Sequence, residues 1–310
     1  MELTWRYTQK IVKYQQPVLI YNPTAGRFRR SPERILHRTT EALARASLHP
    51  QPLPTRAPGD ATKMARQAIA DGADLILVLG GDGTINEVVN GMAHSRVPLG
   101  ILPGGTANVL AMELGLGGNA AKAVERLSGF VERRVALGKL WDGNGTSRHF
   151  LAMGGVGLDA KIVYDINPGF KARAGKVAYW LTGLGHAGQS VGQFDARING
   201  DVYRCGFALA SRVRNYGGDL EIATEASLVR DDFEIVLFEG SNPLRYLWYM
   251  GGVLFRQLPS MKGVRRLRAG HVEFSGDVHL QVDGEYAGRV PASFEIVPGA
   301  LTLLMPGAYK

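Results

Sequence analysis

The stretch of this chain that carries the most chemical information is Leu75–Gly91, which reads LILVLGGDGTINEVVNG. An apolar run, Leu75–Leu79, predicts a buried strand, and helix-like spacing of apolar residues begins after Thr84. A glycine turn between a strand and a helix directs free backbone N–H groups and the positive helix end at an anion. A Gly-rich turn alone is more often only a turn, but this one predicts nucleotide phosphate binding. The predicted contacts are Gly80, Gly81, Asp82, Gly83, Thr84, Ile85 and Asn86.

Asp82 is the unusual member of this turn. A carboxylate beside phosphates repels them unless a cation such as Mg2+ lies between. We therefore expect Asp82 to act through Mg2+. The lysine-bearing P-loop, G-x-x-x-x-G-K-[ST], does not occur in the chain.

Two further glycine turns follow predicted strands. Asn22-Pro-Thr-Ala-Gly26 follows the apolar run 18–21, and Leu102-Pro-Gly-Gly-Thr-Ala-Asn108 repeats the order of strand, paired glycines, hydroxyl and helix. Read alone, the first is as often a plain turn. Thr106 can cap the following helix or hydrogen-bond a phosphate or base, and the sequence does not separate these roles.

A pair of acidic residues, Asp283 and Glu285, follows the predicted strand 278–282 with Gly284 between them. Transfer of a γ-phosphoryl group to a hydroxyl needs charge neutralisation by Mg2+ and a base that accepts the hydroxyl proton. A carboxylate can be that base, although a hairpin turn with exposed acids would look the same. The sequence does not order the two carboxylates.

The composition describes an ordinary globular protein. The 310 residues favour two domains, with 45% hydrophobic and 21% charged residues. The single cysteine, Cys205, excludes an internal disulfide and fits a reducing compartment. No apolar run is long enough to cross a bilayer, and the first ten residues lack the apolar core of a signal peptide. We therefore expect a cytoplasmic protein.

The net charge of +8 has two interpretations. It indicates either a generally basic solvated surface or attraction to anionic lipid headgroups or a polyphosphate. The aromatic stretch 246–255 precedes Lys262, Arg265, Arg266 and Arg268, which suits a membrane-facing segment but equally a core helix with a basic end. No DNA- or RNA-binding signature occurs, so no nucleic-acid partner is expected.

The pattern of predicted elements changes near residue 135. Before it, strands alternate with helices, which predicts a mainly parallel α/β sheet with ligands at the carboxyl ends of its strands. After it, short alternating segments predict an antiparallel β domain with inserted helices at about 172–186 and 243–256. The predicted strands of this second part are Phe207–Ser211, Phe233–Phe238, Val272–Phe274, Val278–Val282, Ser293–Val297 and Leu301–Leu304.

The segment Gly80–Asn86 resembles the nucleotide-binding motif of the diacylglycerol kinase catalytic-domain family, which includes bacterial lipid kinases and sphingosine and ceramide kinases. NAD kinases share a similar core motif. The resemblance covers about residues 17–305. It implies an N-terminal Rossmann-like three-layer α/β nucleotide domain, 17–135, and a C-terminal antiparallel β-sandwich-like lipid-substrate domain, 136–305, with a cleft between them.

The resemblance also implies roles for particular residues. Glu285 corresponds to the family's proton acceptor, with Asp283 assisting. A structural Mg2+ is implied at Leu228, Asp231 and Phe233, but Asp232 stands where glycine is usual and the segment after it is one residue shorter. Because of that departure, the turn has two interpretations, a metal site or a solvated turn. The implied ATP contacts are Asn22, Pro23, Thr24, Ala25, Gly26, Thr55, Thr106 and Asn108.

Taken together, these features predict a lipid kinase that uses ATP and Mg2+ and phosphorylates a diacylglycerol-like or sphingoid lipid at the membrane surface. We expect it in the cytoplasm, peripheral to the inner membrane face, and the resemblance allows a homodimer. One alternative is an NAD kinase. Another is a catalytically inactive nucleotide or lipid sensor, although Asp82, Asp283 and Glu285 are all present.

Overall fold

A computed structural model describes residues 14–26, 28–165, 191–216 and 220–310. The chain divides into two compact units. Unit 1 runs to Val135 and also contains residues 299–310, and unit 2 comprises residues 136–298. Residues 299–310 therefore extend unit 1 beyond the predicted domain limit of 135. The predicted helix at 172–186 lies outside the described residues.

Unit 1 is built on a parallel sheet. The apolar run Leu75–Leu79 is buried, as expected for a strand covered on both faces. In order, the strands are β2 (Gln51–Pro54), β1 (Pro17–Tyr21), β3 (Leu75–Gly80), β4 (Pro98–Pro103) and the last part of β18 (Ala292–Pro306). Tyr21 pairs with Leu79, and Gly80 pairs with Pro103. The carboxyl ends of β1, β3 and β4 are therefore level with one another.

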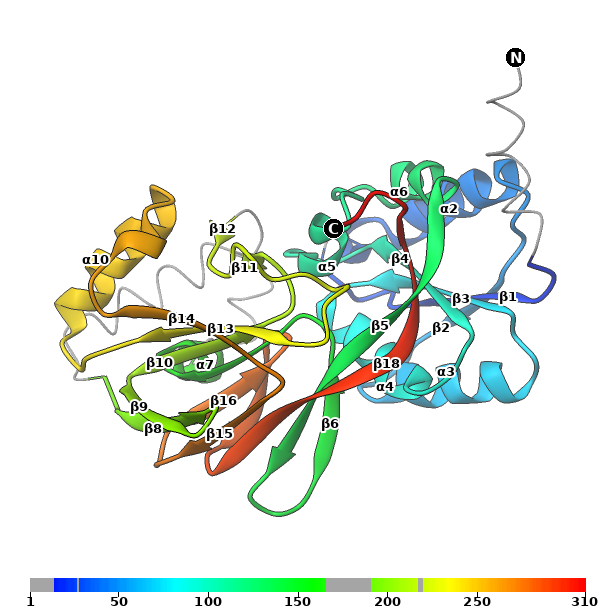
Figure 1. The fold of residues 1–310 in the computed structure, drawn as a ribbon. Coiled ribbons are helices and arrows are strands. Elements are labelled where there is room, and N and C mark those ends of the chain that lie inside the picture. The colour runs from blue at the N-terminus through cyan, green and yellow to red at the C-terminus, as the bar shows by residue number, and fades with distance from the viewer. Residues whose placement is uncertain (1–13, 27, 166–190, 217–219) are drawn as a thin grey trace. The chain divides into compact units, whose positions relative to one another are not determined.

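Helices cover both faces of this sheet (Figure 1). The helices α2 (Pro32–Arg45) and α6 (Ala120–Leu127) pack together on one face. The helices α3 (Asp60–Ala70) and α4 (Asp82–Met92) pack together on the other. In α4 the residues Ile85, Val88, Val89 and Met92 are buried, which is the apolar stripe read from the sequence. This arrangement confirms the predicted three-layer α/β architecture.

Glycine holds the N-cap position of two helices of unit 1. The helix α4 begins at Asp82 rather than after Thr84, because Gly81 takes an extended conformation at the N-cap. The carboxylate of Asp82 then stands at the positive helix end, where it is stabilised. At the start of α3, Gly59 rather than Asp60 holds the N-cap position, with φ +85°. The Asp60 carboxylate instead accepts hydrogen bonds from the backbone N–H groups of Arg56 and Ala57.

Unit 2 is a sandwich of antiparallel sheets. One sheet has the order β14 (Val264–Ala269), β13 (Phe233–Phe238), β10 (Phe207–Ser211), β7 (Met153–Gly157), β16 (His279–Val282) and β17 (Glu285–Arg289). The first part of β18 pairs with β15 (His271–Ser275), which continues to β8 (Phe194–Ile198) and β9 (Asp201–Cys205). The ring of Phe150 lies 5.7 Å from that of Phe233 and 5.2 Å from that of Phe294, so aromatic residues of both sheets meet in the core. The predicted β-sandwich is confirmed.

The other described elements of the chain are shorter or join the sheets. They are η2 (Phe28–Arg30), α5 (Val109–Glu113), β5 (Phe130–Asp142), β6 (Ser147–Phe150), α7 (Leu158–Asp165), β11 (Asn215–Tyr216), β12 (Leu220–Glu221), α10 (Pro243–Leu254) and η3 (Leu258–Ser260). None of the helices in the described part of the chain is long and apolar enough to cross a bilayer.

The strand β18 differs most from its prediction. The two strands expected at 293–297 and 301–304 are one continuous strand of 15 residues. The sequence Pro298-Gly299 reads as a turn, but Gly299 takes a positive φ of +54° within the strand and the chain continues. Residues 292–295 pair with β15 in unit 2, and residues 302–303 pair with β4 in unit 1.

Candidate functional site

Three turns at the carboxyl ends of the parallel strands of unit 1 hold one another through backbone and side-chain hydrogen bonds. The backbone N–H of Asn22 donates to the carbonyl of Leu79 at 3.0 Å, and its side-chain amide donates to Thr84 Oγ1 at 3.1 Å. The backbone N–H of Gly104 donates to the carbonyl of Gly80 at 2.8 Å. The turns 22–26, 80–84 and 104–108 therefore form a single cluster.

Glycine is required where these turns touch. A Cβ atom on Gly105 would lie 2.5 Å from the Cα of Gly81, which is closer than real Cβ atoms approach backbone. A Cβ on Gly26 would lie 2.6 Å from Thr106 Oγ1 and 2.9 Å from the backbone nitrogen of Thr106. The absence of these side chains lets three backbones approach one another and leaves peptide N–H groups at the edge of the sheet.

Asp82 and Asn108 fix the third turn. Asp82 Oδ1 accepts a hydrogen bond of 2.8 Å from the backbone N–H of Val109, the first residue of α5. Asn108 has a left-handed backbone, with φ +51°, and its side chain accepts from the N–H of Gly105 and donates to the carbonyl of the same residue. Because Asn108 holds the N-cap position of α5, Thr106 does not cap that helix, and its side chain is exposed.

The predicted contacts divide into buried and accessible residues. Thr84, Ile85 and Asn86 are buried, and Ile85 belongs to the hydrophobic core. Their side chains therefore organise the turn from inside. Thr24 closes the first turn by donating through its backbone N–H and its hydroxyl to Asn22 Oδ1, at 2.9 and 2.8 Å. Thr55 follows β2, where its backbone N–H donates to the carbonyl of Tyr21 at the end of β1.

In unit 2, the two carboxylates of the Asp283–Glu285 turn have different surroundings. Asp283 and Gly284 both have positive φ, +49° and +79°, which is the conformation of a tight hairpin turn between β16 and β17. The Asp283 carboxylate accepts hydrogen bonds from the backbone N–H groups of Leu151, Ala152 and Met153 at 2.8–3.0 Å. Asp283 therefore anchors the hairpin to the segment that precedes β7.

The side chain of Glu285 is more accessible, with 42% of its surface exposed. Arg148, on β6, places a guanidinium nitrogen 3.4 Å from Glu285 Oε2 and 3.4 Å from the carbonyl of Val282. Arg148 could not be identified from the sequence, because it lies 137 residues away from Glu285. Of the two predicted acids, Glu285 therefore has the more accessible carboxylate, and Arg148 contacts it.

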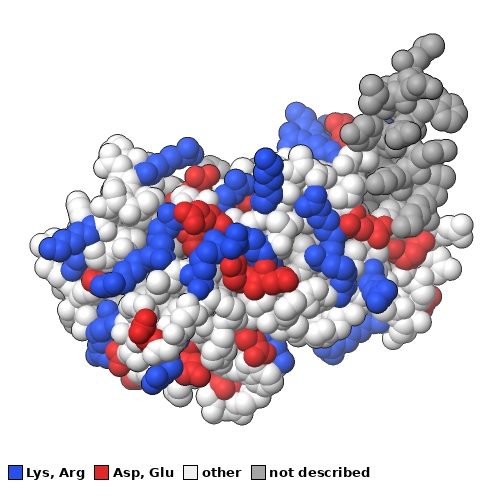
Figure 2. All heavy atoms as spheres, in the orientation of Figure 1, with Lys and Arg blue, Asp and Glu red and all other residues white. Residues whose placement is uncertain are grey.

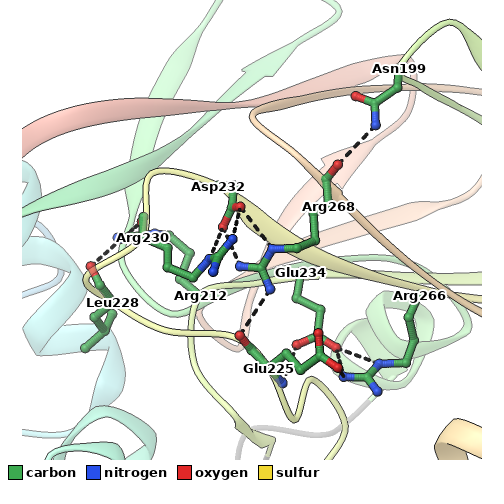
Figure 3. A network of polar contacts seen from close by, with 9 residues as sticks. All are labelled: Asn199, Arg212, Glu225, Leu228, Arg230, Asp232, Glu234, Arg266 and Arg268. Carbon is green, nitrogen blue, oxygen red and sulfur yellow. Dashed lines mark hydrogen bonds and ion pairs between the residues drawn. The ribbon is translucent and has the colours of Figure 1, made fainter. Parts of the chain in front are cut away.

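The predicted metal-binding turn, 228–233, is occupied by arginine contacts (Figure 3). The carbonyl oxygen of Leu228 accepts a hydrogen bond of 2.8 Å from the guanidinium of Arg212. Asp231 is exposed, and Phe233 is a core residue at the start of β13. No cluster of three or more His, Cys, Asp or Glu side chains suited to a metal ion occurs among the described residues.

Comparison with known proteins agrees with this geometry. Residues 16–140 match the model of the diacylglycerol kinase catalytic domain, and residues 153–305 match that of the YegS C-terminal NAD kinase beta sandwich-like domain. A diacylglycerol kinase of Bacillus subtilis is 29% identical over 93% of this chain and 95% of its own length. One of Staphylococcus haemolyticus is 30% identical over 89% of this chain and 84% of its own length.

A solved structure shows the same fold. The crystal structure of a diacylglycerol kinase from Bacillus anthracis superposes with a TM-score of 0.76 at 26% identity, covering 96% of this chain and 99% of that one. The two domain models together match most of the chain, and each relative aligns with about nine tenths of it. The chain belongs to the diacylglycerol kinase catalytic-domain family.

Proposed function

We propose that this protein is an ATP-dependent lipid kinase that transfers the γ-phosphoryl group of Mg-ATP to the hydroxyl of a diacylglycerol-like or sphingoid lipid. The observation that supports it most is the cluster of turns 22–26, 80–84 and 104–108 at level strand ends. The family relationship supports the kinase chemistry, and relatives named diacylglycerol kinase make diacylglycerol the first acceptor to test.

The residues present fit a bound nucleotide. The turns would surround the phosphates with backbone N–H groups, and the exposed hydroxyl of Thr106 would lie beside them. Mg-ATP supplies the phosphoryl group and the charge neutralisation for its transfer. In unit 2, Glu285 accepts the proton of the lipid hydroxyl, while Arg148 and the anchored Asp283 hold it in place.

The test is transfer of labelled phosphate from Mg-ATP to lipids in mixed micelles, with NAD as acceptor in a parallel reaction. Label in the lipid extract supports the proposal and begins to identify the acceptor. Label on NAD would instead make the protein an NAD kinase, a possibility kept open by the description of the C-terminal domain model. ATP binding with label in neither acceptor would favour a sensor.

The packing of Gly105 gives a prediction about nucleotide affinity. We expect Gly105→Ala to raise the Kd for ATP about tenfold or more, because its Cβ would displace the turn at Gly81 by overpacking. Gly129→Ala is the matched control, since a Cβ there has its nearest contact at 3.7 Å. Equal ATP affinity of the two variants, measured by calorimetry, would contradict the assignment of this turn to the nucleotide.

The helix α10 supports membrane docking. Its tyrosines point inward, since Tyr246 and Tyr249 are buried and donate their hydroxyls to the carbonyls of Gly240 and Gly263. The exposed apolar residues are Leu244, Trp248 and Phe255, with 67%, 52% and 77% of their surfaces accessible. At about 100° per residue they fall within a stripe of about 40° on one side of the helix.

The charge near this stripe indicates its partner. Segment 240–272 contains six Lys and Arg residues and no Asp or Glu, and three of the six, Arg265, Arg266 and Arg268, form ion pairs with acidic residues of segment 232–239. On the face drawn in Figure 2, basic and acidic side chains are interleaved. Arg256 and Lys262, just after α10, are exposed. An apolar stripe beside positive charge fits an anionic lipid surface, into which Trp248 and its neighbours would insert.

Replacing Leu244 and Trp248 with Ser tests this docking face. We expect co-sedimentation with phosphatidylglycerol-containing vesicles to weaken about tenfold or more, because two apolar side chains no longer enter the membrane. The matched control is Val202→Ser, which removes a 54% exposed apolar side chain from β9. Unchanged vesicle binding of the double variant would place the docking surface elsewhere. Sedimentation of the protein without lipid is a separate measurement, which tests the homodimer that the family resemblance allows.

A further inference from the structure

The turn that leads into β13 is organised around a buried arginine (Figure 3). The side chain of Arg212 is fully buried. One guanidinium nitrogen donates to the carbonyl oxygens of Leu228 and Arg230, at 2.8 and 3.1 Å, and the other donates to the carbonyl oxygen of Ala136. All four residues belong to unit 2.

Several carbonyl oxygens surround this guanidinium, and a hard metal cation is bound by carbonyl oxygens in the same way. Backbone carbonyls are ordinary ligands of Mg2+ and Ca2+, and the guanidinium is protonated at every working pH. A metal ion on the carbonyl of Leu228 would stand within a few ångströms of this guanidinium. Their repulsion, and the loss of the existing hydrogen bond, would both oppose binding.

The residue that replaces the expected glycine completes this arrangement. Asp232 receives two hydrogen bonds from Arg268, at 2.6 and 3.0 Å, and two from Arg230, at 3.1 and 3.2 Å. Burial acts to raise the pKa of the Asp232 carboxyl, but the hydrogen bonds from Arg268 and Arg230 outweigh burial and hold that pKa below its usual range. Both oxygens of the carboxylate are therefore committed to guanidinium groups rather than to a metal.

A second acidic residue of β13 follows the same pattern. Glu234 is buried and accepts two hydrogen bonds from Arg266, at 2.5 and 2.8 Å, through one oxygen. Its other oxygen accepts from the backbone N–H of Glu225 at 2.7 Å. The loop from 225 to 232 is thus tied to β13 and β14 by protein groups at both ends.

The residues of this turn do not fit the magnesium ion that the family resemblance implies. We propose that the guanidinium of Arg212, together with the Arg230–Asp232–Arg268 network, takes the place of a divalent cation in organising residues 228–232. Residues 228–232 therefore take their fold without a metal ion. The proposal concerns the fold of unit 2 and does not depend on the lipid kinase activity.

The test is thermal unfolding of the full chain without nucleotide, in Mg2+ and in EDTA. We expect the same Tm of the wild-type protein in both. A Tm that rises with Mg2+, with the rise abolished in Asp231→Asn, would overturn the proposal, because Asp231 is the exposed carboxylate of the turn. Electron paramagnetic resonance with Mn2+ gives a second readout on the wild type, and a bound ion lost in Asp231→Asn would equally overturn it.

Variants of the arginine test its role directly. We expect Arg212→Met to lower the Tm in EDTA by about 5 °C or more, since three carbonyl oxygens, two of them in buried contacts, lose this donor, and Arg212→Lys to lower it less. The matched control is Arg197→Met, which removes a 60% exposed guanidinium at 3.5 Å from Glu273 and is expected to leave the Tm unchanged. A wild-type Tm in Arg212→Met would contradict the proposal. If Arg212→Met does not fold, the comparison of the wild-type Tm in Mg2+ and in EDTA still tests whether the turn binds a metal.

Discussion

Replacing Glu285 with Gln is expected to lower kcat for phosphate transfer by about 10²–10⁴, because the amide cannot accept the proton of the lipid hydroxyl. Folding should be unaffected. Glu285 is 42% exposed, and its contact with Arg148 is a long one of 3.4 Å. The Kd for ATP should remain within a few-fold of the wild-type value, since the proposed nucleotide turns belong to unit 1.

The measurement is steady-state transfer of labelled phosphate at saturating ATP, with circular dichroism to confirm folding. Glu273→Gln is a suitable control, because it also changes a half-exposed glutamate of unit 2 whose ion pair with an arginine is 3.5 Å long. A Glu285→Gln enzyme that retains kcat within a few-fold would remove Glu285 as the base. Loss of kcat in both variants would point to a general effect of surface charge.

The Asp283→Ala variant is expected to be destabilised, which distinguishes its role from that of Glu285. Its carboxylate accepts three backbone N–H hydrogen bonds, from residues 151–153. Hydrogen bonds to a charged group are among the stronger ones, and their donors would be left without this acceptor. We expect a loss of about 3 kcal/mol or more in the free energy of unfolding.

Urea unfolding measures this loss, with Asp201→Ala as the control. Asp201 lies at the start of β9 in the same unit, is exposed, and its tyrosine contact is 3.4 Å long. If the Asp283→Ala protein unfolds at the wild-type urea concentration but no longer transfers phosphate, Asp283 takes a direct part in the chemistry. A destabilised protein with partial activity would agree with an anchoring role.

The sequence predicted the parallel half of the fold well because burial on both faces leaves a clear pattern. The run Leu75–Leu79 has no polar residue, and it is bounded by glycine. The exact start of a helix is harder to read from the sequence than a buried strand is. The sequence placed the start of the helix after Thr84, whereas an extended Gly81 allows it to begin at Asp82. A residue's backbone conformation at a cap depends on the turns that surround it.

Contacts between distant residues could not be predicted. The pairing of Arg148 with Glu285 and the carbonyl contacts of Arg212 join residues that are 16 to 137 positions apart. The sequence did give one sign that the turn contacted by Arg212 is unusual, since Asp232 replaces the expected glycine. It could not show that two arginines, Arg230 and Arg268, pair with this carboxylate. The aromatic residues of α10 were also ambiguous, because neighbouring tyrosines and Trp248 face opposite ways.

The course of β18 sets an order for folding during synthesis. Residues 302–303 pair with β4, yet they are made about 200 residues after it, when all of unit 2 has already been synthesised. Until then one edge of β4 lacks its partner, and an unpaired edge is open to association with other chains. The half of the protein that begins first is therefore the half that is completed last.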